Sequence, residues 1–300
     1  MDMTQNKCCR HGANLRRRRR RRRKILRSII FSCSIIAVAV FVAVGSSMIR
    51  SGDGRTNRYD VEAGNNTYDN AVIENSKISE KNKIQNNQSM LDDIMNSTQY
   101  PKQLKDLALK NEEALEFVYD YPAEHVKEHT IDLTEEASMD SVPLFVQWDK
   151  RWGYEKYSGN FFAASGCGPT TLSMVVVYLT HNRDASPIAV AKYSKEAGYS
   201  VDGSGSSWTL ISEGCMHYGV KAKAVALDES RMKAELDEGH PIVVNVGPGD
   251  FTDTGHFMVI TGYDDEGFSI NDPNSIEKSG KRWLFRNISS QIRAVWSMYV

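Results

Sequence analysis

Cys167 lies at a position where a protein can make a thiol reactive. Cys167 lies between Gly166 and Gly168, and it is followed by Pro169 and by an apolar run over residues 172–179. Proline is tolerated in the first turn of a helix, where backbone N–H groups have no intrahelical partner. The partial positive charge of those N–H groups stabilises a thiolate. The stretch predicts a cysteine nucleophile at the start of a buried helix or, without a histidine partner, an ordinary core cysteine.

A histidine and a carboxylate that could serve this thiol follow it along the chain. His256 begins a short apolar segment, and Asp272 ends the next one, because Pro273 cannot extend a strand. A loop of odd length centred on Asp264 would place the two side chains opposite each other on one face. A two-residue turn at 265–266 would place them on opposite faces. Together they predict a general base held by a carboxylate; a structural histidine and a turn-forming aspartate are the alternative.

Four segments of the C-terminal half carry a resemblance to a known family. They cover residues 142–153, 166–171, 255–263 and 271–273. In this order they resemble the papain-like cysteine peptidases of family thirty-nine, in particular the "thirty-nine-like" domains of bacterial surface proteins. The resemblance implies an α+β, papain-like fold, in which a helix lobe packs on an antiparallel sheet. It also implies that Cys167 is the nucleophile, His256 the general base and Asp272 the residue that orients it.

The same resemblance implies that Gln147 donates to the oxyanion, together with the backbone N–H of Cys167. Papain-like enzymes usually place this glutamine about one and a half helical turns before the cysteine, and that place holds Phe161 here. Gln147 must therefore reach the site from a separate segment. The alternative is that Gln147 is simply a polar residue beside a packed pair, Trp148 and Trp152.

The N-terminal region has the charge and hydropathy of a membrane anchor. The first 50 residues hold 13 of the 37 Lys and Arg residues but only one of the 38 Asp and Glu residues. Eight consecutive arginines, residues 16–23, precede an apolar stretch that begins at Ser28 and ends at Ile49. Such a stretch can cross a hydrocarbon core of about 30 Å, with the basic end in the cytoplasm. A signal peptide cleaved near residues 43–45 is the alternative.

Composition divides the chain into five parts. We expect a basic cytoplasmic tail over 1–27, a transmembrane helix over 28–49 and a disordered stalk over 50–90, which is rich in polar residues. Apolar residues then recur at helical spacing, so residues 91–141 are expected to form a helical N-terminal extension. The peptidase domain spans 142–300.

The remaining motifs exclude several classes of site. The acidic body argues against a nucleic-acid partner. The histidines are mostly dispersed and no Cys-x-x-Cys spacing occurs, so neither a metal nor a cofactor is expected. Cys215 is predicted to be a core residue, and a disulfide between it and Cys167 would inactivate the nucleophile. The Gly-rich segments 202–207 and 247–250 are either opposite rims of the cleft or plain turns.

These observations predict a membrane-anchored cysteine peptidase that hydrolyses a peptide amide bond outside the cytoplasm. The chain shows no phosphate-binding loop of an export ATPase, so leader-peptide processing during export is not the favoured role. Two alternatives use the same fold. One is a hydrolase of cell-wall amide bonds, and the other is a binding module without catalysis.

Overall fold

The central sheet is buried on both faces, because successive apolar residues of its inner strands point to opposite sides. The computed structural model describes residues 66–300, with side chains from residue 80 onward. β6 (Ile242–Val246) is buried throughout: Ile242 and Val244 join one hydrophobic cluster, and Val243 joins the other. The same alternation continues along β7 (His256–Asp264). A strand with period-two alternation of buried residues separates two cores, one on each face of the sheet.

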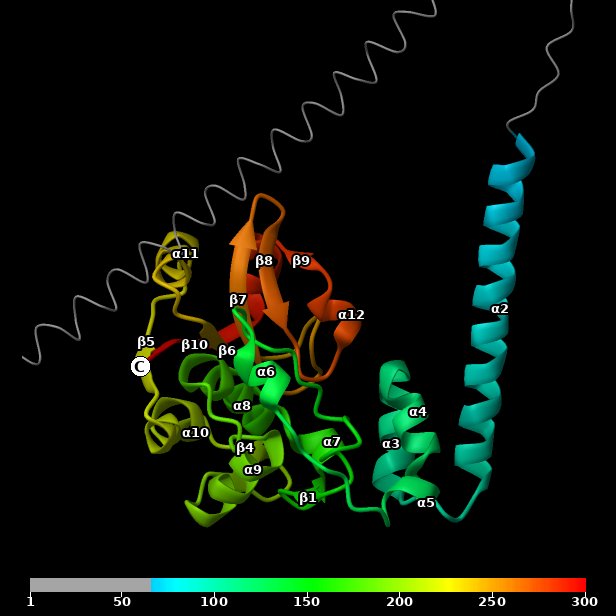
Figure 1. The fold of residues 1–300 in the computed structure, drawn as a ribbon, viewed down its shortest axis with the longest axis horizontal. Helices are drawn as coiled ribbons and strands as arrows, with labels where there is room; N and C mark the ends of the chain where they lie inside the picture. Colours follow the sequence, from blue (N-terminus) through cyan, green and yellow to red (C-terminus); the bar gives the residue numbers. More distant parts are fainter. Residues whose placement is uncertain (1–65) are drawn as a thin grey trace, which may run out of the picture. The chain divides into compact units, whose positions relative to one another are not determined.

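The sheet is antiparallel and has six strands in the order β5-β10-β6-β7-β8-β9 (Figure 1). The four further strands are β5 (Lys221–Ala224), β8 (Gly267–Asn271), β9 (Arg282–Trp283) and β10 (Ile292–Tyr299). β7 and β8 form the hairpin that was predicted to carry the histidine and the aspartate.

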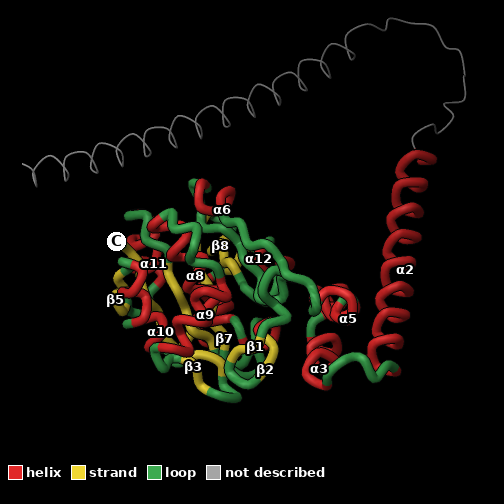
Figure 2. Tube along the Cα trace, turned by 60° about the horizontal axis from the view of Figure 1, so that its bottom comes forward, coloured by secondary structure: helices red, strands yellow, loops and turns green. Residues whose placement is uncertain are grey.

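Helices cover both faces of this sheet (Figure 2). α8 (Cys167–Thr180) is buried nearly all round and packs on one face together with α9 (Pro187–Glu196). α11 (Glu229–Asp237) and α13 (Phe285–Ile288) contribute to the cluster on the other face. The α+β class predicted from the sequence, with helices packed on an antiparallel sheet, is confirmed.

The helical segment before residue 142 packs onto the rest of the fold through an apolar cluster. α3 (Lys102–Lys110), η1 (Glu112–Ala114) and α4 (Leu115–Tyr119) supply most of the cluster, which also includes Phe161 and Ala163. Pro101 stands at the N-cap of α3, while the second proline of this region lies in the first turn of α5 (Tyr121–Glu124). The extension therefore belongs to the same folded unit, which spans residues 70–300.

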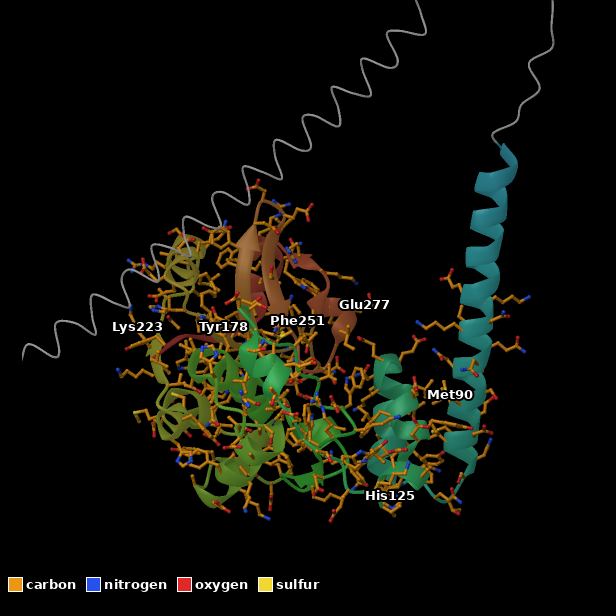
Figure 3. The ribbon with its side chains drawn as sticks, in the orientation of Figure 1. Met90, His125, Tyr178, Lys223, Phe251 and Glu277 are labelled. Carbon is orange, nitrogen blue, oxygen red and sulfur yellow. The ribbon has the colours of Figure 1, made fainter. Side chains whose placement is uncertain are left out.

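The expectation of a disordered stalk over residues 50–90 was wrong for the C-terminal part of that range. Residues 66–96 form one helix, α2 (Asn66–Asn96). This stretch contains neither glycine nor proline, so nothing interrupts the helix. Its last turns are fixed by packing, because Met90 and Leu91 contact the apolar cluster of the extension and Ile94 is buried within it (Figure 3). Residues 50–65 lie outside the described part of the chain.

The remaining short elements connect these layers. They are α6 (Thr134–Ser138), β1 (Lys156–Tyr157), β2 (Asn160–Phe161), α7 (Phe162–Ser165), β3 (Ser200–Val201), β4 (Gly205–Ser206), α10 (Thr209–Ser212), η2 (Gly214–Tyr218), α12 (Ile276–Ser279) and η3 (Ser289–Gln291). The expected basic tail and membrane span, residues 1–27 and 28–49, lie outside the described residues. Among the residues that are described, no helix combines the length and the apolar character needed to cross a bilayer.

Candidate active site

The cysteine occupies the position that the sequence predicted, at the first residue of α8. Its neighbours must be glycines because the chain passes close on both sides. A Cβ atom at Gly166 would lie 2.6 Å from the carbonyl oxygen of Phe162, and one at Gly168 would lie 2.5 Å from Oγ of Ser206. The Cys167 thiol, which is half-buried, is thus held at the positive end of a 14-residue helix.

The histidine and the aspartate come together through an irregularity in the hairpin. Of the two turns that the spacing allowed, the structure has the two-residue one at 265–266 and not the odd-length loop. However, β7 contains one extra residue, Thr261, where the register shifts between Ile260 and Gly262. This bulge reverses the parity of the pairing beyond it. Continued past the end of the ladder, the register places Asp272 diagonally across from His256 on the same face.

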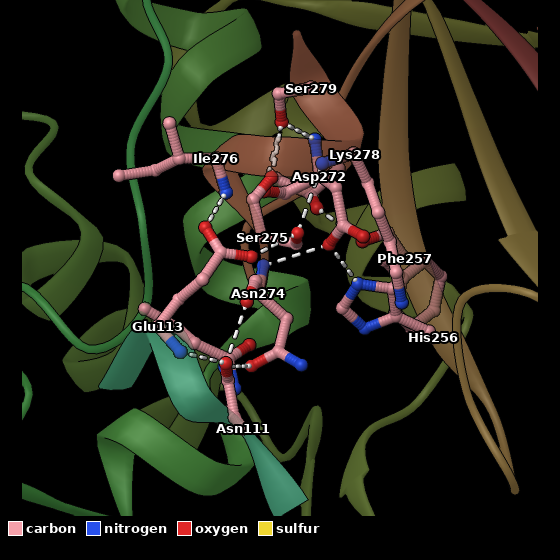
Figure 4. A network of polar contacts seen from close by, with 12 residues as sticks. Asn111, Glu113, His256, Phe257, Asp272, Asn274, Ser275, Ile276, Lys278 and Ser279 are labelled. Carbon is pink, nitrogen blue, oxygen red and sulfur yellow. Dashed lines mark hydrogen bonds and ion pairs between the residues drawn. The ribbon is translucent and has the colours of Figure 1, made fainter. Parts of the chain in front are cut away.

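Both members of this pair are buried and directly bonded. Nε2 of His256 lies 2.7 Å from Oδ1 of Asp272, which is completely shielded from solvent (Figure 4). The same carboxylate oxygen accepts the backbone N–H of Asn274 at 2.8 Å, while Oδ2 has no hydrogen-bond partner among the described residues. Because Nε2 is engaged by the aspartate, Nδ1 is the ring nitrogen left for the thiol.

The electrostatics of the site favour an ion pair between the cysteine and the histidine. Burial raises the pKa of Cys167, but the hydrogen bond and charge of His256 outweigh it, helped by the backbone N–H groups of Phe257 and Gly168, and the pKa is lowered. Burial lowers the pKa of His256, but the charge and hydrogen bond of Asp272, with smaller help from Cys167, raise it to about 10. Opposite shifts of this kind favour the thiolate and the imidazolium over the neutral thiol and imidazole.

A buried hydroxyl ties the helix of the cysteine to the strand of the histidine. Thr171, one turn after Cys167 on α8, donates its Oγ1 hydrogen to the carbonyl oxygen of Phe257 at 3.1 Å. Phe257 directly follows His256. This bond fixes the position of Cys167 relative to His256, and no sequence motif at Thr171 predicted it.

Gln147 reaches the site from its separate segment. Its backbone N–H donates to the carbonyl oxygen of Pro273 at 2.7 Å, and its side-chain Nε2 donates to the carbonyl oxygen of Ala163 at 2.7 Å. The side chain is buried yet lines the same groove as Cys167 and His256. Because an amide group carries two N–H donors, one remains for another acceptor.

A groove of about 500 Å³ opens beside the cysteine. The loop over residues 249–255 lines it, in agreement with the predicted role of the 247–250 segment as a rim. The other predicted rim, 202–207, does not line this groove; it forms the β3–β4 hairpin instead. α3 of the extension takes part with Gln103, Asp106 and Lys110. No local pattern in the sequence pointed to α3, because its approach depends on packing across the fold.

The second cysteine among the described residues is not part of the site. Cys215 lies in η2, is completely buried and forms no disulfide with Cys167. Burial raises its pKa to about 11. Within the described part of the chain, no group of three or more His, Cys, Asp or Glu side chains is arranged to hold a metal ion.

The known proteins that this chain resembles include one protein family and two solved structures. A family model described as "Peptidase_C39 like family" matches residues 139–300. Two solved structures are similar. One is the peptidase domain of Streptococcus ComA, described as a bifunctional ABC transporter involved in a quorum-sensing pathway (20% identity, TM-score 0.36, covering 45% of this chain and 90% of that one). The other is a C39-like peptidase, so described, from Bacillus anthracis (16% identity, TM-score 0.34, covering 53% and 95%).

No curated protein matches the chain. The family match spans more than half of the sequence and includes Cys167, His256, Asp272 and Gln147. The chain therefore belongs to the Peptidase_C39 like family.

Proposed function

We propose that this protein is a cysteine peptidase that hydrolyses a peptide amide bond through Cys167, His256 and Asp272. One observation carries the proposal: the imidazole is buried between a thiol and a carboxylate, bonded to the carboxylate at 2.7 Å, beside an open groove. A buried histidine that served only to pack would not need a charged partner on one side and a thiol at a helix start on the other.

The proposed chemistry follows from this geometry. The sulfur of Cys167 attacks the carbonyl carbon, so a C–S bond forms and the carbonyl electrons move to oxygen. His256 then gives its proton to the leaving nitrogen as the C–N bond breaks, which leaves a thioester. Water attacks the thioester, His256 accepts a proton from it, and the acid product leaves with the sulfur restored. Asp272 holds the ring in one orientation and stabilises its cationic form throughout.

Two donors are proposed to stabilise the negative oxygen that forms during each attack. The backbone N–H of Cys167 lies in the first turn of α8, where N–H groups have no intrahelical partner. The second Nε2 hydrogen of Gln147 supplies the other donor, since the first is bonded to Ala163. A buried amide held at both its backbone and its side chain keeps this geometry without reorganising during the reaction.

The location of the activity is proposed from the sequence. The arginine run followed by the apolar stretch 28–49 supports a single membrane span with the N-terminus in the cytoplasm and the peptidase domain outside it. The substrate would then be a peptide, or the peptide part of the cell wall.

The first test is the pH dependence of thiol alkylation. The full chain is treated with iodoacetamide over a range of pH, and peptide mapping follows Cys167 and Cys215 separately. Cys167 should react well below about pH 8, where an ordinary thiol is largely protonated, and Cys215 should stay slow. An ordinary titration of Cys167 would refute the proposal.

Turnover then distinguishes peptidase from the alternatives. A peptide library is incubated with the full chain and with Cys167→Ala, and Cys215→Ser serves as the matched cysteine control. Cleavage that depends on Cys167 supports a peptidase. Release of fragments from purified cell wall alone would assign a cell-wall amide hydrolase, and a reactive thiol without either cleavage would assign a binding module.

A further inference from the structure

The turn that carries Asp272 lies outside the regular ladder of the sheet. β8 ends at Asn271, and beyond it Asp272 makes a single isolated bridge to Ser275. Pro273, between them, has no backbone N–H to donate. The direction in which the carboxylate points therefore depends on the contacts that hold this turn. Ser279 of α12, Gln147 and Trp148 make some of them, and two residues of the helical extension make the others.

Glu113 of η1 holds the far end of the turn. Its Oε2 accepts the backbone N–H groups of Ile276 at 2.7 Å and Glu277 at 3.1 Å, and its Oε1 accepts the hydroxyl of Ser275 (Figure 4). Glu113 thereby caps α12 with a carboxylate from a part of the chain more than 160 residues earlier. A carboxylate at the start of a helix satisfies N–H groups that have no partner inside the helix.

Asn111 holds the centre of the turn. Its Nδ2 donates to the backbone oxygen of Asn274 at 2.9 Å and to the side-chain oxygen of the same residue at 3.1 Å. Its own Oδ1 accepts the backbone N–H of Glu113 at 3.0 Å, so the two residues orient each other. Asn274 in turn donates its backbone N–H to Oδ1 of Asp272. An unbroken series of hydrogen bonds thus runs from the extension to the carboxylate that contacts His256.

We propose that Asn111 and Glu113 are positioning residues for Asp272, so that the helical extension before the family domain forms part of the catalytic machinery. Both residues lie outside the match to residues 139–300. The inference rests on the proposed function, because it gives Asp272 the role of orienting His256.

The physical reason is the steep dependence of the Asp272–His256 interaction on geometry. At 2.7 Å a carboxylate both bonds the ring and stabilises its positive charge. Burial lowers the pKa of His256, and the charges and hydrogen bonds of Asp272 and Cys167 raise it; Asp106, Lys110, Asp250, Asp253 and Lys278 line the same groove. Loosening the turn weakens the bond between His256 and this carboxylate. The pKa of His256 should then fall and that of Cys167 should rise.

The experiment measures iodoacetamide alkylation of Cys167 against pH in the full chain, in Glu113→Ala and in Asn111→Ala. We expect the apparent pKa of Cys167 to rise by about 0.5–1 unit, which lowers the thiolate fraction below that pKa about 3- to 10-fold. Asp272→Ala should move the profile in the same direction and further. Glu112→Ala is the matched control, because Glu112 is an exposed neighbour that bonds Asn87 and not the turn; it should leave the profile unchanged.

A double-variant cycle separates positioning from general stability. If Glu113 acts through Asp272, then adding Glu113→Ala to Asp272→Ala should change the profile no further; a merely structural role would add a second, independent loss. Alkylation of Cys215 reports unfolding, since its thiol is completely buried. Should Glu113→Ala expose Cys215, Glu113→Gln, which keeps the volume and one acceptor oxygen, takes its place in the cycle.

Two failures can be told apart. If Asp272→Ala shifts the profile while both extension variants leave it unchanged, the positioning role is overturned and the proposed peptidase stands. If Cys167 of the unaltered chain titrates as an ordinary thiol, the proposed function is overturned and the positioning role with it.

Discussion

Replacing Asp272 with asparagine tests the charge of the carboxylate separately from its hydrogen bonds. Oδ1 accepts two hydrogens, from Nε2 of His256 and from the backbone of Asn274, while Oδ2 accepts none among the described residues. The Asn274 N–H requires an oxygen at Oδ1, so it determines which way the amide of Asp272→Asn points. The variant therefore keeps the orientation of the ring and loses the negative charge.

The magnitude follows from that loss. Removing an opposite charge at hydrogen-bond distance lowers the pKa of a histidine by about 1–3 units, or about 1.4–4 kcal/mol of imidazolium stabilisation. If the reaction needs the ion pair, kcat of Asp272→Asn should fall about 10- to 1,000-fold. The kcat of Asp272→Ala should fall further, because the imidazole ring of His256 is then free to turn. The variant should also lose about 1–3 kcal/mol of stability, since the buried ring N–H of His256 and the half-buried N–H of Asn274 lose their acceptor.

The assay combines turnover of a cleaved library peptide with urea unfolding and with the pH profile of Cys167 alkylation. Asp265→Asn is the matched control: it makes the same substitution in the exposed turn of the same hairpin. Asn271 is unsuitable as a neutral control, because its Nδ2 holds the backbone oxygens of Val142 and Pro143. Full turnover in a folded Asp272→Ala protein would remove Asp272 from the mechanism.

Four further predictions follow from the same site. On the acid side, activity should fall below the usual pKa of a thiol, where Cys167 becomes protonated. On the alkaline side, it should fall above the usual pKa of a histidine, where His256 loses its proton. A pH profile in which neither limb is displaced would contradict the ion pair. Gln147→Ala should lower kcat about 100-fold or more with little change in KM, and an unchanged kcat would exclude it as an oxyanion donor. Thr171→Val should cost about 1 kcal/mol in urea unfolding and slow alkylation, because the bond between α8 and β7 is lost; equal stability would show that this bond is dispensable. Protease added to intact cells should release the acidic body and leave the basic tail protected; a shorter soluble protein in the medium would identify residues 28–49 as a cleaved signal.

Sequence patterns over a few residues were enough to predict the local structure around individual residues of the site. A cysteine flanked by glycines and followed by proline and an apolar run predicts the start of a buried helix, because the unpaired N–H groups there tolerate proline. The structure places Cys167 at the first residue of α8. The short apolar segment that begins at His256 and the strand-ending Pro273 likewise predicted the hairpin. Each of these signals acts over a few residues of the chain.

The geometry between those residues was decided by contacts that no local pattern encodes. Whether His256 and Asp272 share a face of the hairpin depends on one bulged residue, Thr261. The spacing of 16 residues between them does not reveal this bulge. α3 enters the groove and Glu113 caps α12 because apolar packing of the extension brings together segments far apart in sequence. The sequence by itself therefore determined which groups can react, and the tertiary structure decided their distances, since a strand register and a hydrogen bond across 160 residues are settled only when the whole core packs.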